Sequence, residues 1–254
     1  MTGELIVVKI GSNVLTDAQG RLDRWSFRRI ARQIKKLYLQ NKKLIIVSSG
    51  AITCGTERLK IDYRQRTIPQ KQAAAAVGQS LLMNYYTKYL WPVPVGQVLL
   101  TAEAISNKER SQNLCNAIEQ LLKMRVIPII NENDSVVVDE IKFGDNDTLS
   151  AQVAVLVKAN KLIIMTDIDG LYDSNPRQNP QAQLLHVVEK VTPEIIKVAG
   201  GTGTYKGTGG MFSKVQAAKL ATGSGIETYL VNGCRKNILF DALKHKAECT
   251  RFKV

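Results

Sequence analysis

The chain has 254 residues and a net charge of +13, from 35 Lys and Arg against 22 Asp and Glu. Its hydrophobic content of 44% is ordinary for a globular protein, and no apolar run reaches the roughly 20 residues that a membrane span requires. The start of the chain does not resemble a secretory signal, and the four cysteines form no CxxC pair. We therefore expect a cytoplasmic protein with no membrane partner and no structural zinc site.

The excess of positive charge allows two interpretations. One is binding of nucleic acid, and the other is a basic surface whose potential favours anionic substrates. The cations are spread along the whole chain and are densest between Arg28 and Lys43. No aromatic residues are interleaved with them as a platform for stacking bases. We therefore expect no nucleic-acid partner.

Short apolar runs alternate along the chain with longer segments of helical periodicity. The short runs predict strands that are covered on both faces, at Leu5–Ile10, Leu44–Ser48, Val95–Leu100, Val126–Ile130, Leu162–Met165 and Thr228–Val231. The longer segments predict helices at Trp25–Leu39, Pro69–Leu90, Asn107–Met124, Asn146–Lys158 and Ser213–Thr222. A β-hairpin outside the main sheet is predicted over Val136–Phe143. This alternation predicts an α/β fold, a three-layer α/β/α sandwich around a central, mostly parallel sheet.

The first two predicted strands end in residues suited to an anion. Lys9 stands in an otherwise apolar strand, where a cation is costly to bury unless it meets an anion, and Gly11 lets the backbone approach a ligand closely. Lys9 either faces a phosphate at the carboxyl end of its strand or reaches solvent from an edge. The turn Ser48-Ser49-Gly50-Ala51 either opens a helix with free N–H groups for an anion or contains an ordinary serine cap.

Two polar segments occupy the middle of the chain. Asn131-Glu132-Asn133-Asp134 follows a predicted strand, and four consecutive polar residues there predict a substrate loop. Asp145-Asn146-Asp147 opens a predicted helix, and helix capping explains one of these residues but hardly all three. Acidic groups here could orient a lysine, accept from a substrate amine or lie near Mg²⁺.

Two later segments contain glycines and polar residues. Thr166-Asp167-Ile168-Asp169-Gly170 resembles part of a calcium loop, but Leu171 stands where that loop needs an acid or amide, so we reject calcium. Gly207–Lys214 is neither a Walker A loop nor a GxGxxG fingerprint. It could be a flexible surface loop. We favour phosphate binding, because Lys214 falls in the first turn of a predicted helix, where the helix dipole disfavours a cation.

In combination these motifs resemble the amino acid kinase family, most closely the branch whose acceptor is the γ-carboxylate of glutamate. The resemblance covers residues 4 to 243, and the Asn-Glu-Asn-Asp and Gly-Asp-Asn-Asp segments separate this branch from acetylglutamate kinases, aspartokinases and uridylate kinases. Many bacterial members carry a further C-terminal PUA domain. We expect a single kinase domain over residues 1–254 and no PUA domain. The matching segments, in chain order, are Val8–Ser12, Val47–Ile52, Gln97–Thr101, Pro128–Asp134, Phe143–Asp147 and Gly207–Lys214.

The resemblance implies transfer of the γ-phosphoryl group of ATP to L-glutamate, which gives L-glutamyl 5-phosphate, the first step of proline biosynthesis. It implies catalytic roles for Lys9, Asp147 and Lys214, with Asp147 holding the two lysines. It implies that Ser49, Asp134 and Asn146 bind glutamate, with Asp134 on the α-ammonium group. The implied ATP-binding residues are Lys9, Gly11, Ser12, Thr166, Asp167, Thr208, Gly209, Gly210, Met211, Phe212, Ser213 and Lys214. Ser213 stands where the family commonly has threonine, a change that keeps the hydroxyl group.

The cofactors implied are ATP and Mg²⁺, with Mg²⁺ on the phosphate oxygens and no metal-binding residue in the chain. The resemblance also implies a homo-oligomer, and the downstream glutamyl phosphate reductase as a possible partner. Two alternatives remain open. Another amino acid kinase could use N-acetylglutamate or aspartate, although Asp134 favours an acceptor with a free amine. A basic RNA-binding or regulatory protein could keep the fold without activity, although every motif keeps its lysines and acids.

Overall fold

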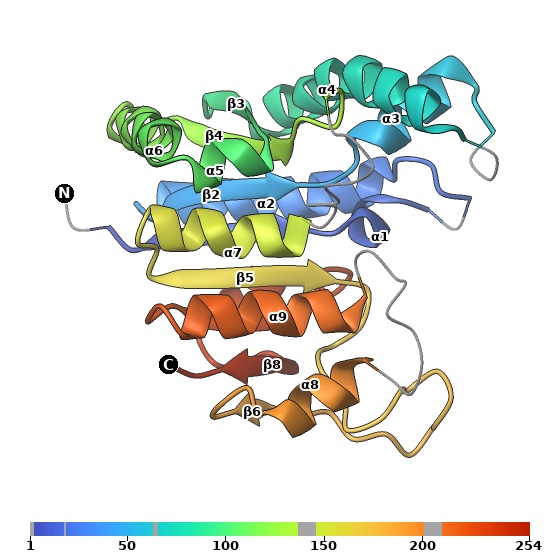
Figure 1. Ribbon diagram of the computed structural model, residues 1–254, viewed down its shortest axis with the longest axis vertical. Coiled ribbons are helices and arrows are strands. Elements are labelled where there is room, and N and C mark those ends of the chain that lie inside the picture. The colour runs from blue at the N-terminus through green and yellow to red at the C-terminus, as the bar shows by residue number, and fades with distance from the viewer. Residues whose placement is uncertain (1–2, 18, 63–65, 137–145, 201–209) are drawn as a thin grey trace.

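The computed structural model describes residues 3–17, 19–62, 66–136, 146–200 and 210–254. Helices pack on both faces of a sheet, so the predicted three-layer α/β/α sandwich is confirmed (Figure 1). The strands are β1 (Leu5–Ile10), β2 (Lys43–Ser48), β3 (Val95–Leu100), β4 (Ile127–Glu132), β5 (Lys161–Thr166), β6 (Val187–Val188), β7 (Glu227–Asn232) and β8 (Cys249–Phe252). The helices are α1 (Ser12–Leu15), α2 (Arg24–Leu39), α3 (Ala51–Leu59), α4 (Ile68–Leu90), α5 (Ala102–Ser106), α6 (Lys108–Lys123), α7 (Asn146–Leu156), α8 (Pro193–Gly200), α9 (Met211–Thr222) and α10 (Ile238–Leu243).

The eight strands of the described sheet have the order β3-β4-β2-β1-β5-β7-β8-β6. Strands β3, β4, β2, β1, β5 and β7 run parallel to one another, and β8 runs antiparallel to β7. The central strands β1, β2 and β5 are almost fully buried, as their continuous apolar runs predict. One expectation was wrong: β3 is not covered on both faces, because it forms an edge of the sheet and leaves Gln97 and Leu99 exposed.

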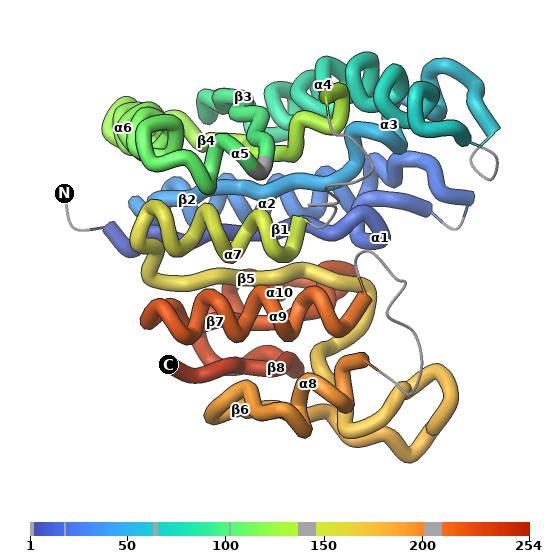
Figure 2. Tube along the Cα trace, viewed as in Figure 1, coloured from blue at the N-terminus to red at the C-terminus, as the bar shows by residue number. Residues whose placement is uncertain are grey.

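Alternate residues of each central strand enter two separate hydrophobic clusters. Ile6, Val8 and Ile10 of β1 pack in the cluster that includes α2, α4 and α10, whereas Val7 packs in the cluster that includes α7 and α9. Figure 2 shows α9 and α10 on opposite sides of the sheet. Because Lys9 is two residues from Val7, strand alternation directs its side chain toward α7 and α9.

Two helices on the other face approach each other with their backbones nearly in contact. A Cβ atom at Gly55 of α3 would lie 1.7 Å from the carbonyl oxygen of Ala74, and one at Gly78 of α4 would lie 1.8 Å from that of Ala51. Only glycine fits at both positions, since neither obstacle is a flexible side chain. This contact places α3, and therefore the turn that precedes it, against α4.

Gly78→Ala should destabilise the protein although alanine is the better helix former. The added methyl group forces α3 away from α4, which costs about 2 kcal/mol or more. Ser80→Ala, at an exposed position of the same helix, is the matched control and should change stability by less than about 0.5 kcal/mol. Urea unfolding of both variants measures the difference. Equal stabilities would contradict the close contact between α3 and α4.

Candidate active site

Two buried lysines contact one buried carboxylate at the carboxyl end of the sheet. Lys9 of β1 forms an ion pair with Asp147 Oδ1, and Lys214 Nζ lies 3.0 Å from Asp147 Oδ2. Asp147 is in the first turn of α7, and Lys214 is in the first turn of α9. Their side chains are at most 7% exposed. The structure therefore brings together the three residues for which the sequence implies catalytic roles.

The charges of these three side chains sum to +1, which suits an incoming phosphate. Burial alone would raise the pKa of Asp147, but the charges and hydrogen bonds of Lys9 and Lys214 outweigh it and keep this pKa below its usual value. Ser213 Oγ also donates to Asp147 Oδ2 at 2.9 Å. The carboxylate is thus ionised at neutral pH and holds both ammonium groups in place.

Backbone groups beside the lysines complete a surface suited to an anion. The N–H of Gly11 donates to the carbonyl oxygen of Met165, and a Cβ atom at this position would lie 3.6 Å from Lys9 Nζ and 3.0 Å from that carbonyl oxygen. Ser12 is exposed at the start of α1. Gly210 opens α9 without a side-chain cap, and the N-terminus of a helix favours an anion.

A second polar cluster surrounds Asn146, the residue before Asp147. Asn146 Nδ2 donates to Ser49 Oγ at 3.0 Å, to the Ser48 carbonyl oxygen at 3.3 Å and to Asn131 Oδ1 at 3.0 Å. Its own Oδ1 is buried and accepts no hydrogen bond from the described residues. A buried acceptor without a donor is costly, so this oxygen fits a substrate N–H group.

Asp134 lies two residues beyond β4 and is partly buried. Burial raises the pKa of its carboxyl group to about 6. A cation from a substrate would lower this pKa again and offset the cost of burying the charge. Asp134 therefore has the properties of an acceptor for an ammonium group.

Thr166 and Asp167 lie at the end of β5, beside the turn that follows β1. Thr166 is buried and donates to Asp167 Oδ1 at 3.1 Å. Asn13 Nδ2 and Arg177 Nη2 donate to Asp167 Oδ2 at 3.3 and 3.1 Å. These bonds and the charge of Arg177 outweigh burial and lower the pKa of Asp167. Nothing in the local sequence marks Asn13 or Arg177 as partners of Asp167, so neither residue was predicted.

Three of the remaining predicted nucleotide residues belong to the first turn of α9. Met211 and Ser213 are partly buried, and Phe212 is 37% exposed. Thr208 and Gly209 lie outside the described residues, as does the predicted hairpin except for the exposed Val136.

The described residues contain no group of three or more His, Cys, Asp or Glu side chains that could hold a metal ion. Among the described helices, none is both long and apolar enough to span a membrane.

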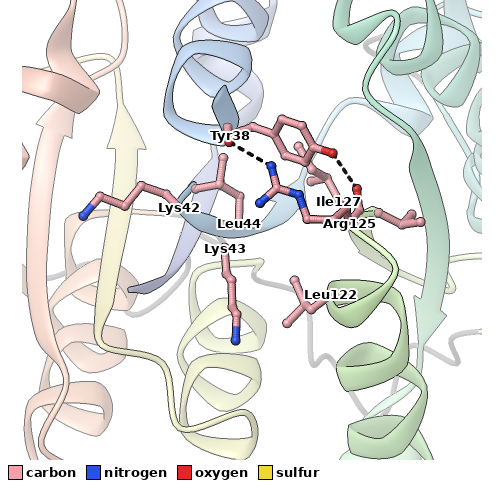
Figure 3. Close-up of a pocket in the computed structure, with 8 residues that line it drawn as sticks. Tyr38, Lys42, Lys43, Leu44, Leu122, Arg125 and Ile127 are labelled. Atoms are coloured by element: carbon pink, nitrogen blue, oxygen red, sulfur yellow. Dashed lines mark hydrogen bonds between the residues drawn. The ribbon is translucent and has the colours of Figure 1, made fainter. Parts of the chain in front are cut away.

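A small pocket at the opposite end of the sheet has a structural role. It includes Lys43, the first residue of β2, together with Tyr38 and Arg125 (Figure 3). The Arg125 guanidinium lies 4.5 Å from the centroid of the Tyr38 ring, and Tyr38 OH donates to the Arg125 carbonyl oxygen at 3.0 Å. These contacts join α2 to the turn before β4, and the pocket is remote from the lysine cluster.

The chain is similar to known proteins both in sequence and in fold. The model of the amino acid kinase family matches residues 4–232. The glutamate 5-kinase of Clostridium tetani is 49% identical over 249 residues, which cover 97% of this chain and 93% of that protein. The glutamate 5-kinase of Geobacter sulfurreducens is 48% identical over 97% of this chain and 67% of its own length. Among solved structures, carbamate kinase from Giardia lamblia bound to AMP-PNP has a TM-score of 0.70 at 16% identity, covering 99% of this chain and 98% of that one. UMP kinase from Ureaplasma parvum has a TM-score of 0.67 at 18% identity, covering 100% of both chains.

Proposed function

This chain belongs to the amino acid kinase family, and we infer that it transfers the γ-phosphoryl group of ATP to the γ-carboxylate of L-glutamate. The products are L-glutamyl 5-phosphate and ADP, and the reaction is the first step of proline biosynthesis. The observation that carries the mechanism is the contact of Lys9 and Lys214 with Asp147, next to a polar cluster around Asn146.

The reaction requires positioning and charge stabilisation rather than a general base. The γ-carboxylate of glutamate is ionised at neutral pH, so one of its oxygens attacks the γ-phosphorus directly while the bond to the leaving ADP oxygen breaks. Lys9 and Lys214 stabilise the negative charge on the transferring phosphoryl group and the β-phosphate. Asp147 keeps both ammonium groups in position between turnovers, and the backbone N–H groups of Ser12 and of the start of α9 bind phosphate oxygens.

The polar cluster binds the amino acid. Asn146 and Ser49 orient glutamate, and the buried Oδ1 of Asn146 accepts from its α-ammonium group. Asp134 supplies the opposite charge for the same ammonium. An N-acetylated acceptor carries no such charge, and it would leave Asp134 buried and unpaired. This favours free glutamate over N-acetylglutamate.

The nucleotide lies between the turn after β1, the end of β5 and the start of α9. We assign Gly11, Ser12, Thr166 and Asp167 to this site, together with the segment from Thr208 to Lys214. Mg²⁺ would be held by the phosphate oxygens and would supply further neutralisation of their charge.

A coupled assay of ADP release across a panel of amino acids tests this function. ADP release should depend on L-glutamate and Mg-ATP, and hydroxylamine should trap the acyl phosphate as a hydroxamate. N-acetylglutamate and aspartate should support much slower release. ADP release that is equally fast without any amino acid would refute the assignment of the acceptor.

Glutamate binding should weaken at acidic pH because of Asp134. Its pKa of about 6 in the folded protein means that the carboxylate is mostly protonated at pH 5, and a neutral acid cannot pair with an ammonium group. The KM for glutamate should therefore rise roughly tenfold between pH 7 and pH 5. This rise should be absent in Asp134→Asn, whose KM is high at both pH values. The same pH dependence in the variant would mean that another group is responsible.

The same substitution should stabilise the free protein at pH 7. The pKa of Asp134 in the folded protein, about 6, lies above the usual value of 3.8. Ionised Asp134 therefore costs stability in full above pH 6, and this cost disappears as pH falls below about 4. Asp134→Asn should raise the free energy of unfolding at pH 7 by about 1–3 kcal/mol, and the gain should vanish near pH 4. Urea unfolding at the two pH values measures this.

A further inference from the structure

Two buried hydroxyl groups connect the C-terminal part of α4 to the turn that carries Ser49. Tyr86 OH donates to Ser48 Oγ at 2.7 Å, and Ser48 Oγ donates to the carbonyl oxygen of Ser49 at 2.9 Å. Tyr86 is 1% exposed and Ser48 is fully buried. Because burial also raises the pKa of Tyr86, its hydroxyl remains protonated and acts as a donor.

The direction of these bonds follows from the number of protons available. A serine hydroxyl has one proton and can accept further hydrogen bonds. Because the Ser48 hydroxyl proton is donated to the Ser49 carbonyl oxygen, the Ser48 oxygen can only accept its second hydrogen bond, and this bond requires another group as donor. Tyr86 is that donor among the described residues. The hydroxyl of Tyr86 therefore supports the orientation of the Ser48 side chain and, through it, of the Ser49 peptide.

The preceding peptide, between Ser48 and Ser49, is held as well. Ser49 N donates to the carbonyl oxygen of Ile10, and Asn146 Nδ2 contacts both the Ser48 carbonyl oxygen and Ser49 Oγ. Gly50 follows with φ of 110°, a conformation that favours glycine, and opens α3 without a side-chain cap. The turn is thus held by hydrogen bonds from β1, from α7 and, through Ser48, from Tyr86 of α4.

We propose that Tyr86 is a positioning residue for the acceptor half of the site. It acts through Ser48 on the Ser49 peptide, which places Ser49 Oγ and the amide of Asn146 for the substrate carboxylate and ammonium groups. This inference rests on the proposed function, because it concerns binding of glutamate at Ser49. The lysine and aspartate side chains around Asp147 are held by contacts of their own. Loss of the Tyr86 hydroxyl should therefore weaken binding of glutamate and leave binding of ATP unchanged.

Tyr86→Phe tests the proposal because it removes only the hydroxyl group. The ring remains to pack edge-on against Phe27, whose centroid is 4.7 Å away. The KM for glutamate should rise roughly tenfold, the scale of one buried hydrogen bond whose acceptor is left without its donor. The KM for ATP should change by less than about twofold, and kcat at saturating glutamate should fall by less than about threefold.

Tyr85→Phe is the matched control. Tyr85 is the adjacent residue of α4, packs on Phe27 at 5.7 Å and makes no hydrogen bond through its hydroxyl within the described residues. It should leave both KM values unchanged. Ser48→Ala should raise the KM for glutamate as Tyr86→Phe does. The double variant should show little more than either single effect, because both substitutions break the same connection.

The outcomes separate this proposal from the function on which it rests. An unchanged KM for glutamate in Tyr86→Phe, or an equal rise in KM for both substrates, would overturn the positioning role. Additive effects of about a hundredfold in the double variant would also overturn it, since they show two independent contributions. If wild type and Tyr85→Phe both lack glutamate-dependent ADP release, the proposed function itself fails, and this inference fails with it.

Discussion

Lys214→Met should lower kcat by about 10²-fold or more, because it removes one of the two cations assigned to the transferring phosphoryl group. Methionine retains most of the side-chain volume, so the start of α9 keeps its packing. The free energy of unfolding without nucleotide should change little, because Lys9 still pairs with Asp147. ADP release and thermal unfolding, each with and without ATP, measure the two effects. ATP should protect the variant less than the wild type.

Two further variants sharpen this test. Lys219→Met, at an exposed position of the same helix, should leave kcat unchanged. Lys214→Arg should not restore full activity, because a planar guanidinium cannot replace a compact ammonium group beside Asp147. Near-normal kcat in Lys214→Met would remove Lys214 from the mechanism. A large loss of stability in the absence of nucleotide would instead make it a structural residue.

Asp147→Asn should strongly lower both the free energy of unfolding and kcat. It leaves the buried ammonium groups of Lys9 and Lys214 without the carboxylate that they share. Breaking a buried ion pair from one side costs about 3–5 kcal/mol, which should lower Tm by about 10 °C in a chain of this size. The pKa of Asp147 lies below its usual value, so its contribution to stability is present at neutral pH and is lost as pH falls through that lowered pKa.

Two further variants test whether the stability lost in Asp147→Asn comes from the buried lysines or from a general loss of packing. Lys214→Met introduced into Asp147→Asn removes one of the two buried cations, and it should recover part of the lost stability while kcat remains low. Glu189→Gln, which breaks the exposed pair with Lys253, should cost less than about 1 kcal/mol. If Asp147→Asn is as stable as the wild type, the two lysines do not depend on this carboxylate.

Local sequence patterns were sufficient to predict the sheet and its main helices. The apolar runs predicted β1 and β3 with their observed bounds and β2, β4, β5 and β7 to within one or two residues. Continuous apolar runs and period-3.6 patterns reflect which faces are buried, and burial is what makes the elements form. The short strands β6 and β8 were missed, because two to four residues show too little periodicity to predict a strand. Strand β8 forms by pairing with β7, and β6 forms by pairing with β8.

The sequence by itself determined the kind of chemistry at this site, because lysines, glycines and acids follow predicted strands, and parallel strands end at one edge of a sheet. Only the tertiary structure decided which of these groups meet. Lys214 and Asp147 are 67 residues apart, and Tyr86 and Ser48 are 38 apart. Such contacts depend on strand order and on which face each helix covers. In the sequence, Tyr86 is indistinguishable from the other core residues of its helix. Its hydroxyl contacts Ser48 only because α4 packs over the end of β2.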